Sequence, residues 1–186
     1  VGGAKDQPGA LYIQSPDGTF KPTNQKLLEQ DRGSEDLGST FLDADGDGDL
    51  DLYVCSGGNE FSNVSTALID RLYLNDGKGN FTKSPQVLPT PAFESTSTVK
   101  SADYDGDGDL DLFVGGRLVA TLYGIPMNSY ILNNDGKGNF KEVTEQVAPG
   151  LKGVGMITDA SWEDIDGDGD PDLIVVGDYM PIKVFL

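Results

Sequence analysis

An acidic segment of nine residues occurs three times in this chain, and its regular recurrence constrains the fold more than any other feature. The copies occupy residues 43–51, 103–111 and 164–172, so the interval between them is 60 and then 61 residues. Repetition at such a fixed interval is typical of folds built from one recurring supersecondary unit. The 186-residue chain is therefore expected to consist of similar units.

Each unit contains four segments that favour strands. An apolar stretch rich in β-branched and aromatic residues follows every acidic segment, at 50–55, 110–115 and 173–177. β-prone residues also precede every acidic segment, at 39–42, 98–102 and 157–162. Residues 72–81 and 130–140 contain Asp-Gly and Gly-Asn pairs, which predict strand, tight turn and strand. Helix is expected only as single turns near 24–30 and 144–147.

Four antiparallel strands in a repeat of about 60 residues are typical of a propeller blade. We therefore expect an all-β chain, a β-propeller of four-stranded antiparallel blades. The expected units are a partial blade (strands 2–4) at 1–36, complete blades at 37–96 and 97–156, and a partial blade at 157–186. Val1–Gly3 is expected to end a second strand, and residues 11–20 to form the third and fourth. Because propellers close with four to eight blades, the chain is interpreted as a fragment of a propeller of roughly seven or eight.

The acidic segments predict metal sites. Carboxylates at alternate positions, with glycines that permit sharp turns between them, can converge on a hard divalent cation, and calcium prefers such oxygen ligands. We expect positions 1, 3, 5 and 9 to ligate through side chains and position 7 through its backbone carbonyl, with one Ca²⁺ per loop and three in the chain. The expected ligands are Asp43, Asp45, Asp47, Asp49, Asp51, Asp103, Asp105, Asp107, Asp109, Asp111, Asp164, Asp166, Asp168, Asp170 and Asp172.

Two other interpretations of these segments were weighed. A solvated acidic turn is disfavoured because the same ligand spacing recurs three times. An EF-hand loop needs a bidentate Glu at position 12 and a helix after it. Position 12 is Val54, Val114 or Val175 within a β-prone stretch, so each loop is expected to lead into a strand.

Composition excludes several functions. The chain has no histidine and a single cysteine, Cys55, so Ser-His-Asp and Cys-His catalysis, intrachain disulfides and cysteine-based zinc sites are excluded within it. The net charge is −18, and three calcium ions would reduce it to about −12. That acidity disfavours nucleic acid and anionic membranes as partners, and no apolar stretch is long enough for direct membrane insertion. Cys55 ends an apolar stretch and is expected to be buried.

The motif Asp-x-Asp-Gly-Asp-Gly-x-x-Asp, followed by Leu and a strand, begins at Asp43, Asp103 and Asp164. It resembles the FG-GAP or VCBS repeat family, whose calcium-binding blades form the head of integrin α subunits. The Asn-Asp-Gly-Lys-Gly-Asn-Phe turn resembles the ASPIC/UnbV, cartilage acidic protein-like branch. The resemblance implies an extracellular, calcium-stabilised propeller used for binding. The chain lacks a clear Phe-Gly…Gly-Ala-Pro signature, so an integrin-like ligand is not implied.

The function expected from these features is noncatalytic binding or scaffolding. The ligand, a protein or a glycan, is expected to contact the loops between the second and third strands, at 56–70 and 117–129, which contain Phe61, Arg117, Tyr123 and Met127. Because calcium is abundant outside cells, we expect a secreted, periplasmic or cell-surface location.

The alternative is a propeller within a polysaccharide-degrading lyase or hydrolase. A glycosidase needs two carboxylates, and Glu60, Glu94 and Glu163 lie outside the acidic segments. No spacing distinguishes these three residues from ordinary surface charges.

Overall fold

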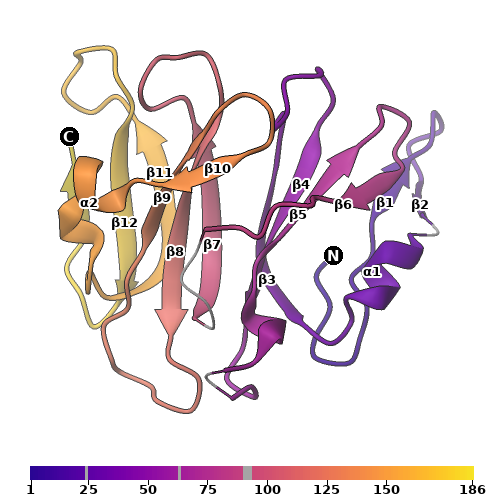
Figure 1. The fold of residues 1–186 in the computed structure, drawn as a ribbon, viewed down its shortest axis with the longest axis horizontal. Coiled ribbons are helices and arrows are strands. Elements are labelled where there is room, and N and C mark those ends of the chain that lie inside the picture. Colours follow the sequence, from indigo (N-terminus) through magenta and orange to yellow (C-terminus); the bar gives the residue numbers. More distant parts are fainter. Residues whose placement is uncertain (24, 63, 90–93) are drawn as a thin grey trace.

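The computed structural model describes residues 1–23, 25–62, 64–89 and 94–186. It consists of four antiparallel sheets that follow one another along the chain (Figure 1). The first sheet is a hairpin of β1 (Tyr12–Gln14) and β2 (Phe20–Pro22). Short helices, α1 (Lys26–Gln30) and α2 (Thr144–Val147), and the 3₁₀ turns η1 (Thr66–Leu68) and η2 (Pro149–Leu151) lie in connections.

The two central sheets have four strands each, paired in sequence order. The first contains β3 (Glu35–Leu42), β4 (Asp51–Gly57), β5 (Arg71–Asn75) and β6 (Phe81–Lys83). The second contains β7 (Ser95–Ala102), β8 (Asp111–Leu118), β9 (Tyr130–Asn134) and β10 (Phe140–Glu142). The last sheet contains β11 (Met156–Glu163), β12 (Asp172–Asp178) and β13 (Lys183–Phe185). The all-β repeat of about 60 residues is thus confirmed.

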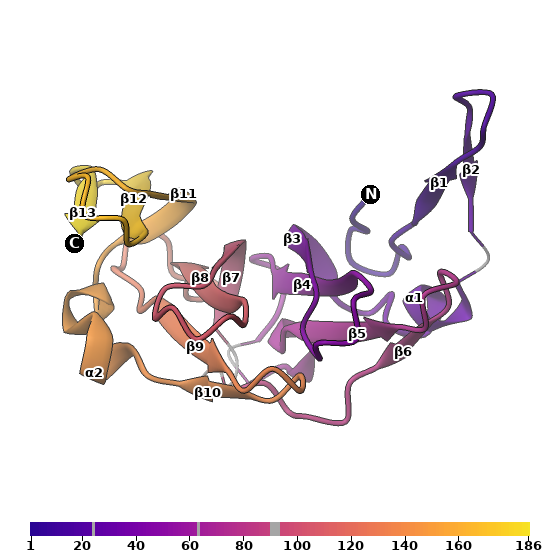
Figure 2. The ribbon, with the colours of Figure 1, turned by 90° about the horizontal axis from the view of Figure 1, so that it is seen from above.

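The last three sheets fan out about their first strands, β3, β7 and β11, as Figure 2 shows from above. At Gly38 in β3, an added Cβ would lie only 2.5 Å from the carbonyl oxygen of Ser97 in β7. The hydroxyl of Ser97 in turn donates to the carbonyl of Ile157 in β11, at 2.8 Å. The first strands therefore lie side by side, and β6 and β10 lie on the outside of an open arc.

The apolar core lies between neighbouring sheets. Leu42, Tyr53 and Leu72 of one sheet pack with Val99 and Leu112 of the next. A second cluster joins Phe113 and Ile131 to Ile157, Leu173 and Val175. Full burial of such side chains contributes about 1.5–3 kcal/mol each, so the sheets stabilise one another. β4 and the first six residues of β8 are buried throughout because both of their faces are covered.

Several details of the expected topology are confirmed. Residues 11–20 contain the start of the β1–β2 hairpin, α1 and α2 lie where single helical turns were expected, and Cys55 is buried and free. Each acidic loop leads into a strand, as the valine at position 12 predicted. Residue 24, part of the first expected helical turn, lies outside the described residues. No helix in the described part of the chain is long and apolar enough to cross a membrane.

Two expectations differ from the structure. The prediction that Val1–Gly3 ends a strand is wrong, because the segment lies outside any strand and against the start of β3. There the amide of Gly3 donates to the carboxylate of Asp36 at 2.8 Å, and Ala10 donates to the carbonyl of Val1. The unit borders expected after residues 36, 96 and 156 fall inside the first strands, which begin one or two residues earlier.

Candidate metal centres

The backbone of each acidic loop is shaped by its own carboxylates. In the first loop, Asp43 accepts hydrogen bonds from the amides of Gly46 (2.9 Å) and Gly48 (3.0 Å). Both glycines have positive φ, 75° and 91°, which other residues rarely adopt. The third loop repeats both bonds, and the second repeats the longer-range one, from Gly108 to Asp103. The glycines therefore let the loop fold around its first carboxylate.

The last carboxylate of each loop is buried at the start of a strand. Asp51 accepts from the amide of Ala44 at 2.9 Å and from the amide of Asn75 in β5 at 2.8 Å. Asp111 is held in the same way by Tyr104 and Asn134, and Asp172 by Ile165. A carboxylate fixed by backbone amides is oriented before any ion arrives.

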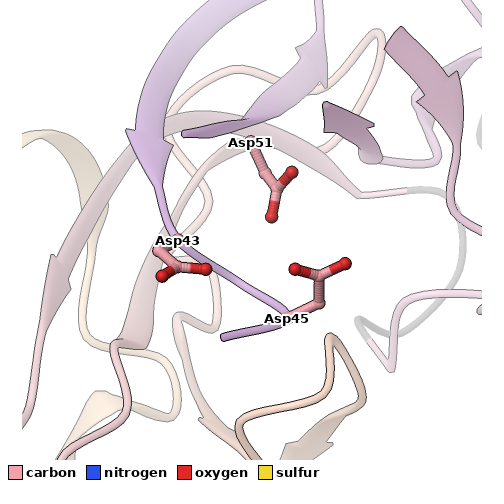
Figure 3. Close-up of side chains that lie close together, drawn as sticks. All are labelled: Asp43, Asp45 and Asp51. Carbon is pink, nitrogen blue, oxygen red and sulfur yellow. The ribbon is translucent and has the colours of Figure 1, made fainter. Parts of the chain in front are cut away.

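These contacts bring three carboxylates of each loop together. One oxygen from each of positions 1, 3 and 9 lies within 4.8 Å of the other two, and Figure 3 shows the three side chains of the first loop converging. The three triads are Asp43, Asp45 and Asp51; Asp103, Asp105 and Asp111; and Asp164, Asp166 and Asp172. Each triad could hold one metal ion.

Two observations indicate that a cation fits these sites. Oδ1 of Asp45 and Oδ1 of Asp103 are buried and have no hydrogen-bond partner among the residues that the structure describes, although a buried carboxylate oxygen normally has one. Burial, together with the charges of Asp105 and Asp107, raises the pKa of Asp111 to about 6, although the amides that it accepts from oppose the shift. Burial also raises the pKa of Asp51. A divalent cation would satisfy the free oxygens and offset the repulsion among the carboxylates.

Positions 5 and 7 lie outside the triads. In all three loops the carboxylate at position 5 accepts from the amide of position 7, as between Asp47 and Asp49 at 2.9 Å. The carboxylate of Asp49 lies against Gly77, in the turn between β5 and β6, where any Cβ would overlap it. Ligation of an ion by positions 5 and 7 therefore stays a prediction. It applies equally to these positions in the other two loops, which are Asp107, Asp109, Asp168 and Asp170.

The structure adds two asparagines that the motif did not indicate. Asn75 and Asn134 end β5 and β9, directly before the Asp-Gly turns. Besides its bond to the last loop carboxylate, each donates from its side chain to the carbonyl at position 8, Leu50 or Leu110. The recurrence of Asn before Asp-Gly in both turns was the sequence signal that could have revealed them.

The edge of the sheets that lies opposite the acidic loops, which we call the opposite rim, carries the loops that were expected to contact a ligand. Phe61 and Met127 are only 6% and 3% exposed, so they pack inside the structure and are not available as contact residues. Arg117 forms an ion pair with Asp178 at 2.7 Å. Tyr123 is 57% exposed and lies edge-to-face with Tyr179, which is 86% exposed, with 6.2 Å between ring centroids. Tyr179 was missed in the sequence analysis because the connection between β12 and β13, in which it lies, is short.

The three glutamates considered for catalysis do not share one surface. Glu163 ends β11 at the rim of the acidic loops, whereas Glu94 lies just before β7 at the other rim. Glu94 is half-buried, accepts a hydrogen bond from Tyr130, and has a pKa raised by burial. Glu60 and Glu163 are exposed.

Comparison with known families matches the description "FG-GAP-like repeat" three times, at residues 1–54, 55–114 and 118–175. Each match ends at position 12 of an acidic loop, so the two later family repeats run from one sheet into the next. No curated protein matches the chain. The three matches cover most of the 186 residues, and the chain belongs to the FG-GAP-like repeat family.

Proposed function

We propose that this chain is a noncatalytic binding module whose sheets are stabilised by calcium, with one ion in each acidic loop. The observation that carries the proposal is the convergence of three carboxylates in every loop, together with the unsatisfied oxygens of Asp45 and Asp103. Oxygen ligands alone, without nitrogen or sulfur, favour calcium or magnesium. Flexible carboxylates on a glycine-rich loop favour the larger ion, because magnesium demands stricter geometry.

We propose that the sheets are blades of a β-propeller. The first strands of the last three sheets, β3, β7 and β11, lie side by side, and the apolar faces of these three sheets pack on one another, as blades require. The arc of the described sheets is open, so closure would need further blades. Four to eight blades close such a ring.

A calcium-dependent module of this kind would work outside the cytoplasm. Sites with dissociation constants of about 10–100 µM are filled at millimolar extracellular calcium and nearly empty at the sub-micromolar level inside cells. The proposed locations are therefore secreted, periplasmic or cell-surface.

The proposed ligand-contacting surface lies on the rim opposite the calcium loops and is centred on Tyr123 and Tyr179. Tyrosine is enriched in binding surfaces because it offers a rigid aromatic face and a polar tip. Here the hydroxyl of Tyr123 donates to Asp178 at 2.8 Å, which holds its ring in place. Thr121 and Tyr179 have positive φ, 69° and 57°. Such backbone conformations cost free energy and are concentrated at functional sites.

A binding screen tests this function. Labelled protein would be applied to arrays of glycans and of extracellular proteins, in millimolar calcium and again in excess chelator. We expect calcium-dependent binding that is weakened by Tyr123→Ala or Tyr179→Ala. Tyr12→Ala is the matched control, because Tyr12 is 46% exposed on the separate β1–β2 hairpin. A chelator that left binding and stability unchanged would contradict the proposed role of calcium.

The second candidate is a part of a polysaccharide lyase or hydrolase, and the environment of Glu94 is the observation that favours it. A half-buried carboxyl with a raised pKa has the character of a general acid. Incubation with a panel of polysaccharides, followed by detection of new reducing ends or unsaturated products, separates the two candidates. Turnover abolished by Glu94→Gln would favour the enzyme.

A further inference from the structure

The side chain of Asn134 donates hydrogen bonds to two acidic loops at once. Its Nδ2 lies 2.9 Å from the carbonyl oxygen of Ala44 in the first loop and 3.2 Å from that of Leu110 in the second. A carboxamide nitrogen carries two N–H groups, so one residue can serve both carbonyls. Asn134 is only 2% exposed, which shields both bonds from competing water.

On the first loop, this contact holds the peptide that separates two candidate ligands. Ala44 lies between Asp43 and Asp45, and its own amide donates to Asp51. The carbonyl of Ala44 also accepts a 2.8 Å bond from the amide of Gly138, in the turn after β9. Two carboxylates of the first triad thus belong to the neighbours of Ala44, and the third accepts a hydrogen bond from its amide. The following sheet holds Ala44 in place through the carbonyl.

On the second loop, Asn134 is attached to a candidate ligand directly. Its backbone amide donates to Oδ1 of Asp111 at 2.8 Å, and its side chain donates to the carbonyl of the preceding residue, Leu110. An ion bound by Asp111 would immobilise both acceptors. The residue that reaches across to Ala44 would then be better positioned.

We propose that Asn134 is a positioning residue that couples the loops at 43–51 and 103–111, so that a cation in one loop raises the affinity of the other. The inference rests on the proposed calcium binding. Such coupling is reciprocal, because each ion changes the affinity for the other by the same factor. One intramolecular hydrogen bond is worth a net of about 0.5–1.5 kcal/mol, which corresponds to a factor of about 2–10 in affinity.

Asn75 provides a matched control within the same chain. It ends β5 as Asn134 ends β9, its amide donates to Asp51, and its side chain donates to the carbonyl of Leu50. Both of these contacts lie in the loop of its own sheet. Substitution of Asn75 therefore perturbs one loop without removing a bridge between two.

Calorimetric titration with calcium chloride measures the coupling. The third loop is disabled in every protein by Asp164→Asn and Asp166→Asn. The first loop is then measured alone with Asp103→Asn and Asp105→Asn, and the second alone with Asp43→Asn and Asp45→Asn. The coupling factor is the overall constant of the protein with both loops intact, divided by the product of the two single-loop constants. It is measured again in Asn134→Leu, Asn134→Ala and Asn75→Leu.

We expect a coupling factor of about 2–10 with Asn134 present, a value near 1 in both Asn134 variants, and retained coupling in Asn75→Leu. A factor near 1 with Asn134 present overturns the inference, even if neither Asn134 variant folds by circular dichroism. An unchanged factor in a folded Asn134 variant also overturns it. Absence of calcium binding in every protein would instead refute the proposed calcium function itself.

Discussion

The hydroxyl of Tyr53 donates a 2.8 Å hydrogen bond to the carboxylate of Asp70, and both side chains are buried. The other oxygen of Asp70 accepts from the amide of Ser56 at 2.7 Å and from the hydroxyl of Thr96 at 2.6 Å. Thr96 lies in β7, so this network joins two neighbouring sheets. It is the polar part of a junction that is otherwise apolar.

In the next sheet, the corner equivalent to that of Tyr53, Asp70 and Ser56 contains no carboxylate. Phe113 and Ser129 lie where Tyr53 and Asp70 lie one repeat earlier, as the strand registers of the two sheets show. The hydroxyl of Ser129 accepts from the amide of Gly116 at 3.1 Å, as Asp70 accepts from Ser56. Among the described residues, the amide contact is the one that both sheets share, so the carboxylate is a feature of the first sheet.

Removal of the Asp70 carboxylate alone should cost more than its removal together with the Tyr53 hydroxyl. Asp70→Ala removes the acceptor of the Tyr53 hydroxyl and of the Ser56 amide, whereas the Thr96 hydroxyl keeps the carbonyl of Ser56 at 3.2 Å. We expect a loss of about 2–4 kcal/mol in the free energy of unfolding. Tyr53→Phe combined with Asp70→Ser reproduces the corner of the second sheet. Its loss in the free energy of unfolding should be smaller than that of Asp70→Ala by at least about 1 kcal/mol. Urea denaturation in calcium-saturated buffer measures both. Equal losses would show that the hydroxyl is not left unsatisfied in the single variant.

Stability should depend on pH through Asp70. Burial raises its pKa from 3.8 to about 6 in the folded chain. A raised pKa means that the folded state favours the neutral carboxyl, so this contribution is complete below about pH 4 and is lost as pH rises through 6. The free energy of unfolding of the wild type, minus that of Asp70→Asn, should fall by up to about 3 kcal/mol over that interval. The subtraction cancels the titration of the acidic loops. A difference that rose with pH would show that nearby Arg71 favours the ionised carboxylate.

The acidic loops could be predicted from sequence because their chemistry is local. Alternate aspartates and positive-φ glycines determine the course of the loop, and valine at position 12 indicates the strand that follows. The start of the first strand was less predictable. Before Ser39 the strand extends through a bulge to Glu35, and its polar residues pair with Ser56 and Gly57. The polar residues at the start of β3 do not favour a strand by themselves, and the segment is a strand because β4 pairs with it.

Contacts between neighbouring sheets could not be predicted from the amino-acid sequence. The bond between Asn134 and Ala44 joins residues 90 positions apart, and no local pattern indicates it. The same limitation applies to Phe61, which resembles a contact residue in sequence but packs with Leu68 of its own loop and with Ala120 of the neighbouring loop. An aromatic residue in an insertion suits either role, and only the position of the next sheet decides between them.

Chelation of calcium should destabilise the chain. At 1 mM calcium, a site with a dissociation constant of about 10–100 µM adds roughly 1.5–3 kcal/mol to the free energy of unfolding. Thermal unfolding followed by circular dichroism, in 1 mM calcium and in excess chelator, should give a lower midpoint without the ion. Magnesium at the same concentration is the control and should restore less stability, because magnesium demands stricter geometry than calcium does. Identical midpoints in calcium and chelator would contradict a stabilising role.

Three substitutions within the first loop should separate its ligands. With the other two loops disabled, Asp45→Asn should weaken calcium binding at least about tenfold, because it removes the charge of a triad member. Asp47→Asn should also weaken binding strongly if position 5 ligates through its side chain. Asp49→Asn should change affinity by less than about threefold, because position 7 is expected to ligate through its backbone carbonyl and its carboxylate lies against Gly77. Calorimetric titration measures all three, and a loss at Asp49 as large as that at Asp45 would show that the position 7 side chain reaches the ion.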